Sequence, residues 1–193
     1  MAVNLQKGQK VDLTKGNAGL KKVVVGLGWD EAQKRGFFSR GADFDCDAEA
    51  ILLTDDKLTD KSDVVFYNNL RHKSGCVIHQ GDNLTGGGDG DDEQIVVFLN
   101  DLPQSYNRIV FTVTIYQAYE RKQHFGMIKN AFIRIVNADN NQELCRFNLT
   151  DNYDQKTSMV FGELYRRNGE WKFNAVGDGT QDDGISQVIK RYI

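Results

Sequence analysis

The sequence predicts an all-β fold, an antiparallel β-sandwich of about ten strands followed by a short C-terminal helix. Apolar and polar residues alternate in short runs along most of the 193 residues, and helical periodicity is almost absent before the C-terminus. Many short strand-like runs in succession are typical of sandwiches and barrels. The predicted strands lie at 20–29, 43–53, 64–69, 75–79, 94–99, 108–116, 131–136, 143–149, 158–166 and 170–176.

Two local signals define the C-terminal part of this fold. Asn168-Gly169 lies between the last two runs, and Asn-Gly is the strongest short-range signal for a hairpin with a type I′ turn. Further on, Ile185, Val188 and Tyr192 recur at helical spacing, which predicts a short helix packed on the sandwich. No linker-like break interrupts the chain, so we predict a single domain over residues 1–193.

Composition limits the possible functions. A formal net charge of -3 and a pI near 5.6 provide no basic footprint for nucleic acid. The N-terminus lacks the apolar core of a signal peptide, and no stretch approaches the roughly 20 apolar residues that span a bilayer, so we expect a cytoplasmic protein. Cys46, Cys76 and Cys145 are widely spaced among apolar neighbours, which indicates buried, reduced thiols.

The most informative stretch is the acidic segment GDNLTGGGDGDDE at residues 81–93, which has no Lys or Arg between Lys73 and Arg108 to neutralise it. At about 6 Å and an effective dielectric near 20, each pair of like charges costs about 2 to 3 kcal/mol. A folded loop of this kind therefore requires an added cation, and oxygen ligands favour calcium. The candidate ligands in this segment are Asp82, Asn83, Asp89, Asp91, Asp92 and Glu93.

A solvated loop without a metal is the alternative interpretation, because Gly/Asp-rich segments often have no other role. Against it, the segment runs directly into the buried strand predicted from QIVVFL, which anchors the acids. The spacing from Asp82 to Glu93 matches an EF-hand loop, but Leu84 and Gly86 occupy positions where that motif has oxygen ligands. We therefore exclude an EF-hand.

A second acidic element lies on a predicted strand. In DFDCDAEAILL, strand alternation places Asp45, Asp47 and Glu49 on one face and apolar residues on the other. A solvent-facing surface would explain this pattern, although Asp and Glu are poor strand formers and neighbouring like charges are unfavourable. With Asp30 at the end of another strand, these residues and the 82–93 loop could form a two-calcium cluster at one end of the sandwich.

The same segments carry a family resemblance. The chain resembles the TerD family of bacterial tellurite-resistance and stress proteins over essentially its full length. The motifs that match are KKVVVGLGWD, FDCDAEAILL, GDNLTGGGDGDDEQI, NAFIRIVN and FGELYRRNGEWKFNAVG. The resemblance implies a cytoplasmic calcium-binding β-sandwich with no established enzymatic activity, encoded among genes for resistance to tellurite, phage and certain colicins.

The resemblance also assigns residues. The family's acidic positions fall here on Asp30, Asp45, Asp47, Asp82, Asn83, Asp89, Asp91, Asp92 and Glu93. One departure is GDGTQDDG at 177–184, which is more acidic than in many members. We interpret Asp178, Asp182 and Asp183 as loop and helix N-cap residues.

We therefore expect a non-enzymatic module in which two calcium ions order an acidic pole that presents a surface to other stress and tellurite-resistance proteins. The alternative is a metal-assisted hydrolase or nucleotide-processing enzyme that uses the same acids. His72, His79 and His124 lack zinc-ligand spacing, and no nucleophile motif is present. The basic, aromatic segment 118–130 is expected to be an exposed loop. Oligomeric state and peripheral association with a membrane complex stay open.

Overall fold

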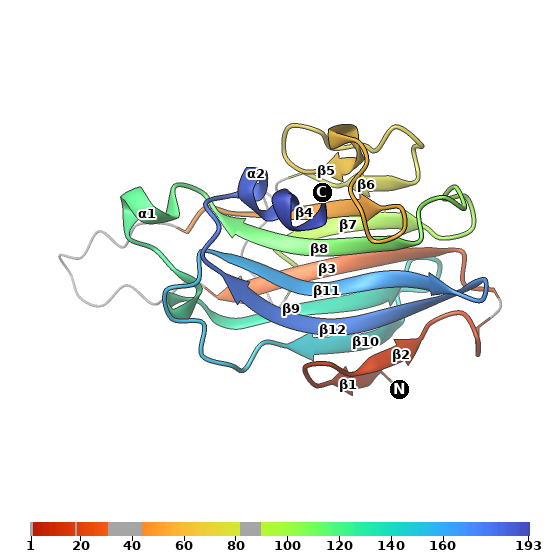
Figure 1. The fold of residues 1–193 in the computed structure, drawn as a ribbon. Helices are drawn as coiled ribbons and strands as arrows, with labels where there is room; N and C mark the ends of the chain where they lie inside the picture. Colours follow the sequence, from red (N-terminus) through yellow and green to blue (C-terminus); the bar gives the residue numbers. More distant parts are fainter. Residues whose placement is uncertain (1, 18, 31–43, 82–89) are drawn as a thin grey trace.

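Two six-stranded sheets pack face to face in the computed structural model, which describes residues 2–17, 19–30, 44–81 and 90–193 (Figure 1). Sheet A has the order β1 (Val3–Leu5), β10 (Glu143–Asn148), β9 (Lys129–Asn137), β3 (Lys22–Asp30), β7 (Glu93–Phe98), β6 (Val77–His79). Sheet B has the order β2 (Lys10–Asp12), β12 (Glu170–Thr180), β11 (Ser158–Arg167), β8 (Arg108–Ile115), β4 (Cys46–Leu53), β5 (Val64–Val65). The predicted β-sandwich is confirmed.

Each of the ten predicted runs contains a strand, and the sequence missed two. These are the three-residue edge strands β1 and β2, whose VNL and KVD segments are too short to show alternation. Strand β1 pairs with β10 in the parallel direction, while the other strand pairs of the described residues are antiparallel. Contacts with a neighbouring strand, and not local propensity, therefore define these two edges.

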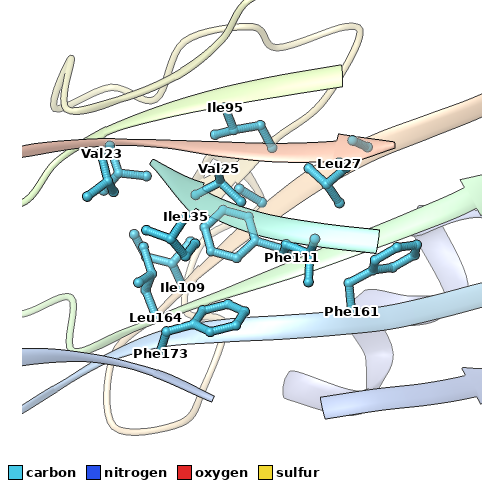
Figure 2. Packing of buried hydrophobic residues seen from close by; sticks show 14 of the residues in the cluster. Val23, Val25, Leu27, Ile95, Ile109, Phe111, Ile135, Phe161, Leu164 and Phe173 are labelled. Carbon is cyan, nitrogen blue, oxygen red and sulfur yellow. The ribbon is translucent and has the colours of Figure 1, made fainter. Parts of the chain in front are cut away.

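The core lies between the sheets (Figure 2). Because successive side chains point to opposite faces of a strand, Val25 and Leu27 of β3 face inward and meet Phe111 and Phe161 of sheet B. All four are 0% exposed. This packing fixes the register of every central strand, since a one-residue slip would turn the apolar set out to solvent.

The predicted hairpin forms between β11 and β12, with Arg167 paired to Glu170. Asn168 and Gly169 have φ values of 55° and 78°, both in the left-handed region that a type I′ turn requires. The two strands place Gly162 against Phe173, where a β-carbon would collide with the ring. The Asn-Gly signal thus predicted the turn and its backbone geometry correctly.

The predicted C-terminal helix is also present, as α2 (Ile185–Val188) followed by the 3-10 turn η3 (Ile189–Tyr192). Val188 is buried in a second apolar cluster, on the outer face of sheet B, with Ile51 and Val110. The helix N-cap residue is Gly184, so the assignment of an aspartate to that position was wrong.

The aspartates at 177–184 have other roles because β12 continues to Thr180. Asp182 accepts hydrogen bonds from the Thr180 hydroxyl at 2.7 Å and from Arg191 Nε at 2.6 Å, which ties the C-terminal segment to the end of β12. Asp178 lies within β12 and pairs with Lys7.

The segment 118–130 is more ordered than predicted. It contains α1 (Ala118–Arg121) and the 3-10 turn η2 (Phe125–Met127), and Ala118 and Phe125 are buried. A third 3-10 turn, η1, spans Lys61–Asp63. Within the described ranges, no helix is long and apolar enough to cross a membrane.

The cysteine prediction is confirmed, since Cys46, Cys76 and Cys145 are all buried. Burial raises the pKa of Cys145 to about 12, which keeps this thiol protonated and unreactive.

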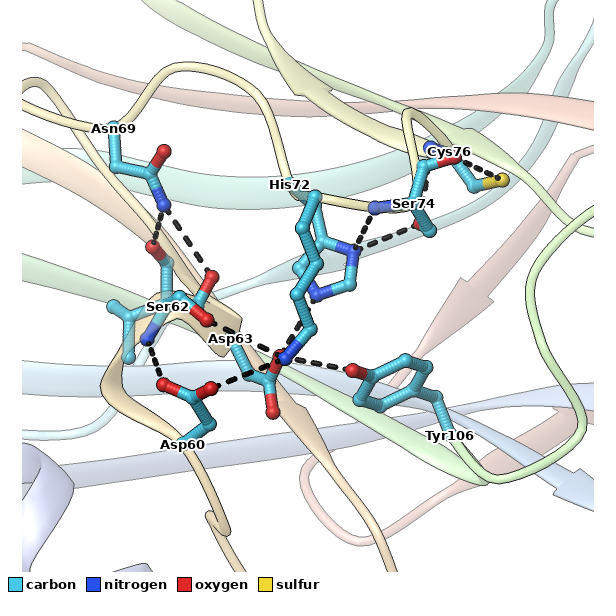
Figure 3. Close-up of polar contacts among 10 residues, drawn as sticks. Asp60, Ser62, Asp63, Asn69, His72, Ser74, Cys76 and Tyr106 are labelled. Carbon is cyan, nitrogen blue, oxygen red and sulfur yellow. Dashed lines mark hydrogen bonds and ion pairs between the residues drawn. The ribbon is translucent and has the colours of Figure 1, made fainter.

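A buried polar network fixes the connection between β4 and β6 (Figure 3). The Asp63 carboxylate, 1% exposed, accepts hydrogen bonds from His72 Nε2 at 3.0 Å and from the Tyr106 hydroxyl at 2.9 Å. Lys73 Nζ lies 2.7 Å away. Burial would raise the pKa of Asp63, but these three donors outweigh it and the pKa lies below its ordinary value of 3.8.

We predict that Asp63→Asn lowers the free energy of unfolding at pH 7 by about 3 kcal/mol, because it removes the buried charged acceptor that His72, Tyr106 and Lys73 share. Tyr106→Phe removes one hydrogen bond and should cost about 1 kcal/mol. A lowered carboxylate pKa stabilises the fold above pH 3.8, and this contribution is lost as the pH falls through the folded-state pKa. Urea denaturation should therefore show a difference between wild type and Asp63→Asn that narrows below pH 4; a constant difference would contradict this role.

Candidate functional site

Acidic side chains from both sheets meet in a cleft at one end of the sandwich. Asp45 directly precedes β4, Asp47 lies within it, and Glu93 is the first residue of β7. They line a cleft of about 450 Å³, which we call the acidic cleft. Its other lining residues are Cys46, Tyr67, Leu70, His79, Gly81 and Tyr116. The structure therefore brings two predicted ligands of sheet B together with one of sheet A.

Glu93 is the most enclosed of the three acids, at 6% exposed. His79 Nδ1 accepts a hydrogen bond from the Gly81 backbone N–H at 3.0 Å. A neutral His79 ring therefore carries its one N–H proton on Nε2. That atom lies 3.1 Å from the Ala48 carbonyl oxygen and 2.6 Å from Glu93 Oε2. Oε2 therefore has His79 as its close polar neighbour. Among the described residues, no donor makes a well-directed hydrogen bond to this oxygen.

Glu49 also lies at this end of the molecule, although it is not among the predicted calcium ligands. It is 1% exposed, and its two carboxyl oxygens accept hydrogen bonds from Thr112 and Thr114 at 2.7 and 2.6 Å. Burial, with smaller contributions from the charges of Asp47 and Glu93, raises its pKa to about 8. Glu49 therefore stays protonated at neutral pH and avoids adding a charge. Alternation predicted its place beside Asp47 but not its burial.

Asp91 has a different environment, on the outer face of sheet A. Its Oδ1 lies 2.7 Å from Arg134 Nε, and its Oδ2 accepts from Arg134 Nη2 at 3.1 Å and Gln94 Nε2 at 2.9 Å. The carboxylate rests over Gly26, where a β-carbon would collide with it. Arg134, from β9, thus supplies a positive charge that the local sequence lacks. Asp91 is not among the residues that line the acidic cleft.

Asp30 and Asp92 form a second acidic group, at the end of β3. Asn130 Nδ2 donates to Asp30 Oδ2 at 2.6 Å, and the Trp29 backbone N–H donates to Asp92 Oδ2 at 2.6 Å. Burial raises the pKa of Asp92, and the charges of Asp30 and Asp91 raise it further. The crowding of negative charge that the sequence predicted is therefore present here too.

The remaining predicted ligands, Asp82, Asn83 and Asp89, lie outside the described residues. Gly81, which precedes them in the chain, lines the acidic cleft. In the part of the chain that the structure covers, no group of three or more His, Cys, Asp or Glu side chains is arranged to hold a metal. Calcium binding therefore stays a prediction.

A hydrogen-bonded Ser–His–Asp chain, which the sequence did not suggest, lies in the network of Figure 3. Ser74 Oγ is 2.8 Å from His72 Nδ1, and His72 Nε2 is 3.0 Å from Asp63. The His72 ring is 1% exposed, and Ser74 Oγ accepts the Cys76 backbone N–H at 3.2 Å. Ser74 does not line the acidic cleft, and its hydroxyl is already engaged with His72 and with the Cys76 backbone, so this chain is best explained as a structural support for the turn.

Comparison with known proteins identifies the family. The model of the TerD domain matches residues 1–192. The chain belongs to the TerD family. It is 48% identical over 193 residues to the tellurium resistance protein TerD of Serratia marcescens, covering 100% of this chain and 97% of that protein. It is also 49% identical over 199 residues to the stress response protein SCP2 of Bacillus subtilis, with full coverage of both chains.

Solved structures agree with this TerD assignment. The crystal structure of SAV2460, a protein of unknown function, has a TM-score of 0.64 and 25% identity, covering 87% of this chain and 94% of that one. A homologue of telluride resistance protein from Streptomyces coelicolor A3(2) has a TM-score of 0.63 over 87% of this chain and 95% of its own; at 23% identity it supports the fold alone. The family is thus one of tellurium-resistance and general stress proteins.

The contrast between Asp91 and Asp47 yields a prediction for the chelator-treated TerD chain. Asp91→Asn should lower the free energy of unfolding by about 3 kcal/mol, because Arg134 loses its buried counter-charge. Asp47→Asn should change it much less, because Asp47 is only partly buried and lines a cleft with other acids, so the substitution removes one of several neighbouring negative charges. Urea denaturation in EDTA measures both. Equal effects of the two substitutions would refute the distinction between an aspartate buried against Arg134 and one that lines the cleft.

Proposed function

We propose that this protein is a cytoplasmic, non-enzymatic calcium-binding module of a tellurium-resistance and stress-response system. Two calcium ions order the acidic pole, and the ordered pole presents a surface to partner proteins. The acidic cleft carries this proposal, because three carboxylates from opposite sheets line it and its described lining residues include no Lys or Arg.

The donor set supports calcium in particular. Asp45, Asp47 and Glu93 offer only oxygen atoms, and calcium accepts six to eight oxygen ligands in flexible geometry. Arg121 lies 3.7 Å from the 57% exposed Asp45 carboxylate, where such a surface pair contributes little. The buried Glu93 carboxylate also supports a cation in the cleft, because the close polar neighbour of its Oε2 among the described residues is the His79 imidazole, and that contact is not a well-directed hydrogen bond.

Two groups of carboxylates suit two ions. Asp45, Asp47 and Glu93 would contribute to one ion, and Asp30 and Asp92 to the other. The further predicted ligands Asp82, Asn83 and Asp89 lie outside the described residues. A bound ion screens the repulsion among these groups and joins β4 of sheet B to β7 of sheet A, so the pole becomes stiffer without any change in the core.

The partners that we propose are other stress and tellurium-resistance proteins. Relatives of this chain carry names such as tellurium resistance protein TerX and TerZ of Serratia marcescens, at 41% and 37% identity. A module without catalytic machinery can act in such a system only through the surfaces that it presents.

Calorimetric titration of the chelator-treated protein with calcium tests the proposal. We expect calcium at 100 times its Kd to stabilise the fold by about 2.7 kcal/mol, with little effect from magnesium, which demands a small octahedral site. Asp47→Asn and Glu93→Gln should each weaken calcium at least tenfold, or about 1.4 kcal/mol. Absence of binding heat and of any stabilisation would refute calcium as the cofactor.

Asp139→Asn is the matched control for these titrations. Asp139 is exposed, in the turn after β9, where Ala138 N–H bonds to the carbonyl of Lys22 at the start of β3. Lys22 and Asp30 lie at opposite ends of the nine-residue strand β3. The control position is therefore about 26 Å from Asp30 along that strand. It should leave calcium affinity unchanged.

A metal-assisted hydrolase or nucleotide-processing enzyme is the second candidate. One observation favours it: Glu49, with its raised pKa, and His79 lie close to the acidic cleft, and perturbed acids beside a cleft can serve as general acids. We expect the wild type to release no more phosphate from ATP or p-nitrophenyl phosphate, with calcium or magnesium, than the Asp47→Asn variant does. Turnover that Asp47→Asn and Glu49→Gln both abolish would favour the enzyme instead.

A further inference from the structure

Exposed aromatic side chains gather beside the acidic cleft. Tyr67, Tyr116 and Tyr119 are 53%, 44% and 55% exposed, and Leu70 is 43% exposed. All four line the acidic cleft or the cleft next to it. Large exposed apolar groups that cluster in this way mark interaction surfaces, whereas single ones need no explanation.

The adjoining cleft, of about 330 Å³, is lined by residues of β4, α1 and the start of α2, and we call it the tyrosine groove. It shares Asp47, Tyr67 and Tyr116 with the acidic cleft, and it adds Tyr119 and Glu120. The Tyr119 hydroxyl donates to the Gln181 carbonyl oxygen at 2.6 Å, which holds this ring in place across the groove. The walls are therefore aromatic and partly fixed before a ligand arrives.

The charge of the groove is negative. Asp47, Glu120 and Asp183 line it, and no Lys or Arg is among its described lining residues. The chain itself shows what such a surface attracts: the Arg121 guanidinium lies 5.1 Å from the centre of the Tyr116 ring and 3.7 Å from the Asp45 carboxylate. Arginine meets both features, because its plane stacks on aromatic rings and its N–H groups bind carboxylates.

We propose that the tyrosine groove binds an arginine side chain presented by an extended segment of a partner protein. This inference rests on the partner surface of the proposed function and names its chemistry. A lysine fits less well, because its compact ammonium cannot stack its face on a ring and bind two carboxylates at once. Asp47 lies at the boundary of the two clefts, so with calcium bound there the groove keeps Glu120 and Asp183 as its exposed carboxylates for the arginine.

The probe is the capped peptide acetyl-Gly-Gly-Arg-Gly-Gly-amide, and the control probe replaces Arg with citrulline, its neutral isostere. Titrations are followed by ¹⁵N–¹H NMR of the full chain in saturating calcium chloride. We expect saturable shifts at the amides of Tyr116, Tyr119 and Gly184 with the arginine peptide and none with citrulline. Equal shifts with citrulline, or no shifts with arginine, would overturn the proposal.

Two substitutions of Tyr119 distinguish the contribution of its aromatic ring from that of its hydrogen bond. Tyr119→Phe and Tyr119→Leu both lose the bond to Gln181, but only Phe keeps an aromatic face. We expect at least tenfold weaker peptide binding for Leu and nearly unchanged binding for Phe. Tyr165→Leu, at the far end of β11, should leave peptide binding unchanged. Equal losses for Tyr119→Phe and Tyr119→Leu would contradict stacking.

Measurements of calcium binding distinguish a failure of this inference from a failure of the proposed function on which it rests. Tyr119→Leu should keep the calcium affinity of wild type, since no predicted calcium ligand changes. If calcium displaces the peptide from wild type, the arginine merely occupies calcium ligands and the groove proposal fails. If wild type binds no calcium, the proposed function fails, and the same titration in calcium-free buffer still tests the groove.

Discussion

Repulsion among carboxylates at one end of the sandwich is the constraint on which the rest of this structure depends. The apolar faces of β3, β4 and β7 fix their register, and that register leaves no freedom to move the acids apart. Each acid must therefore lower its own cost. Glu49 does so by staying protonated between two threonines, and Asp91 does so by pairing with Arg134. Asp45, Asp47 and Glu93 are the acids for which calcium is proposed.

This distribution separates two kinds of acid that look alike in the sequence. Asp91 and Asp63 are almost fully buried, each is held by several donors, and each fixes one part of the fold. The carboxylates of the acidic cleft face an open volume instead. The acids that hold the fold together thus differ from those for which calcium is proposed, so under this proposal a cation would bind or leave without unfolding the sandwich.

The same separation extends to the surface beside the cleft. The Asp63 network fixes the connection that carries Tyr67 and Leu70, and Asp182 fixes the segment before α2. The tyrosine groove lies between these two supports. A surface held in this way loses little conformational entropy when a partner binds, which favours recognition by a few aromatic and charged contacts.

Periodicity in the sequence determined the strands, the Asn-Gly hairpin and the C-terminal helix, because alternation and turn chemistry are local properties. It also placed Asp45 and Asp47 on one side of a strand and Glu93 at the root of another, which is why these three could be grouped in advance. Only the tertiary structure decided that Arg134 neutralises Asp91, that Glu49 is buried, and that tyrosines from two separate segments share a groove. Those facts depend on which strands become neighbours, and contacts between residues far apart in the chain leave no periodic trace in a single sequence.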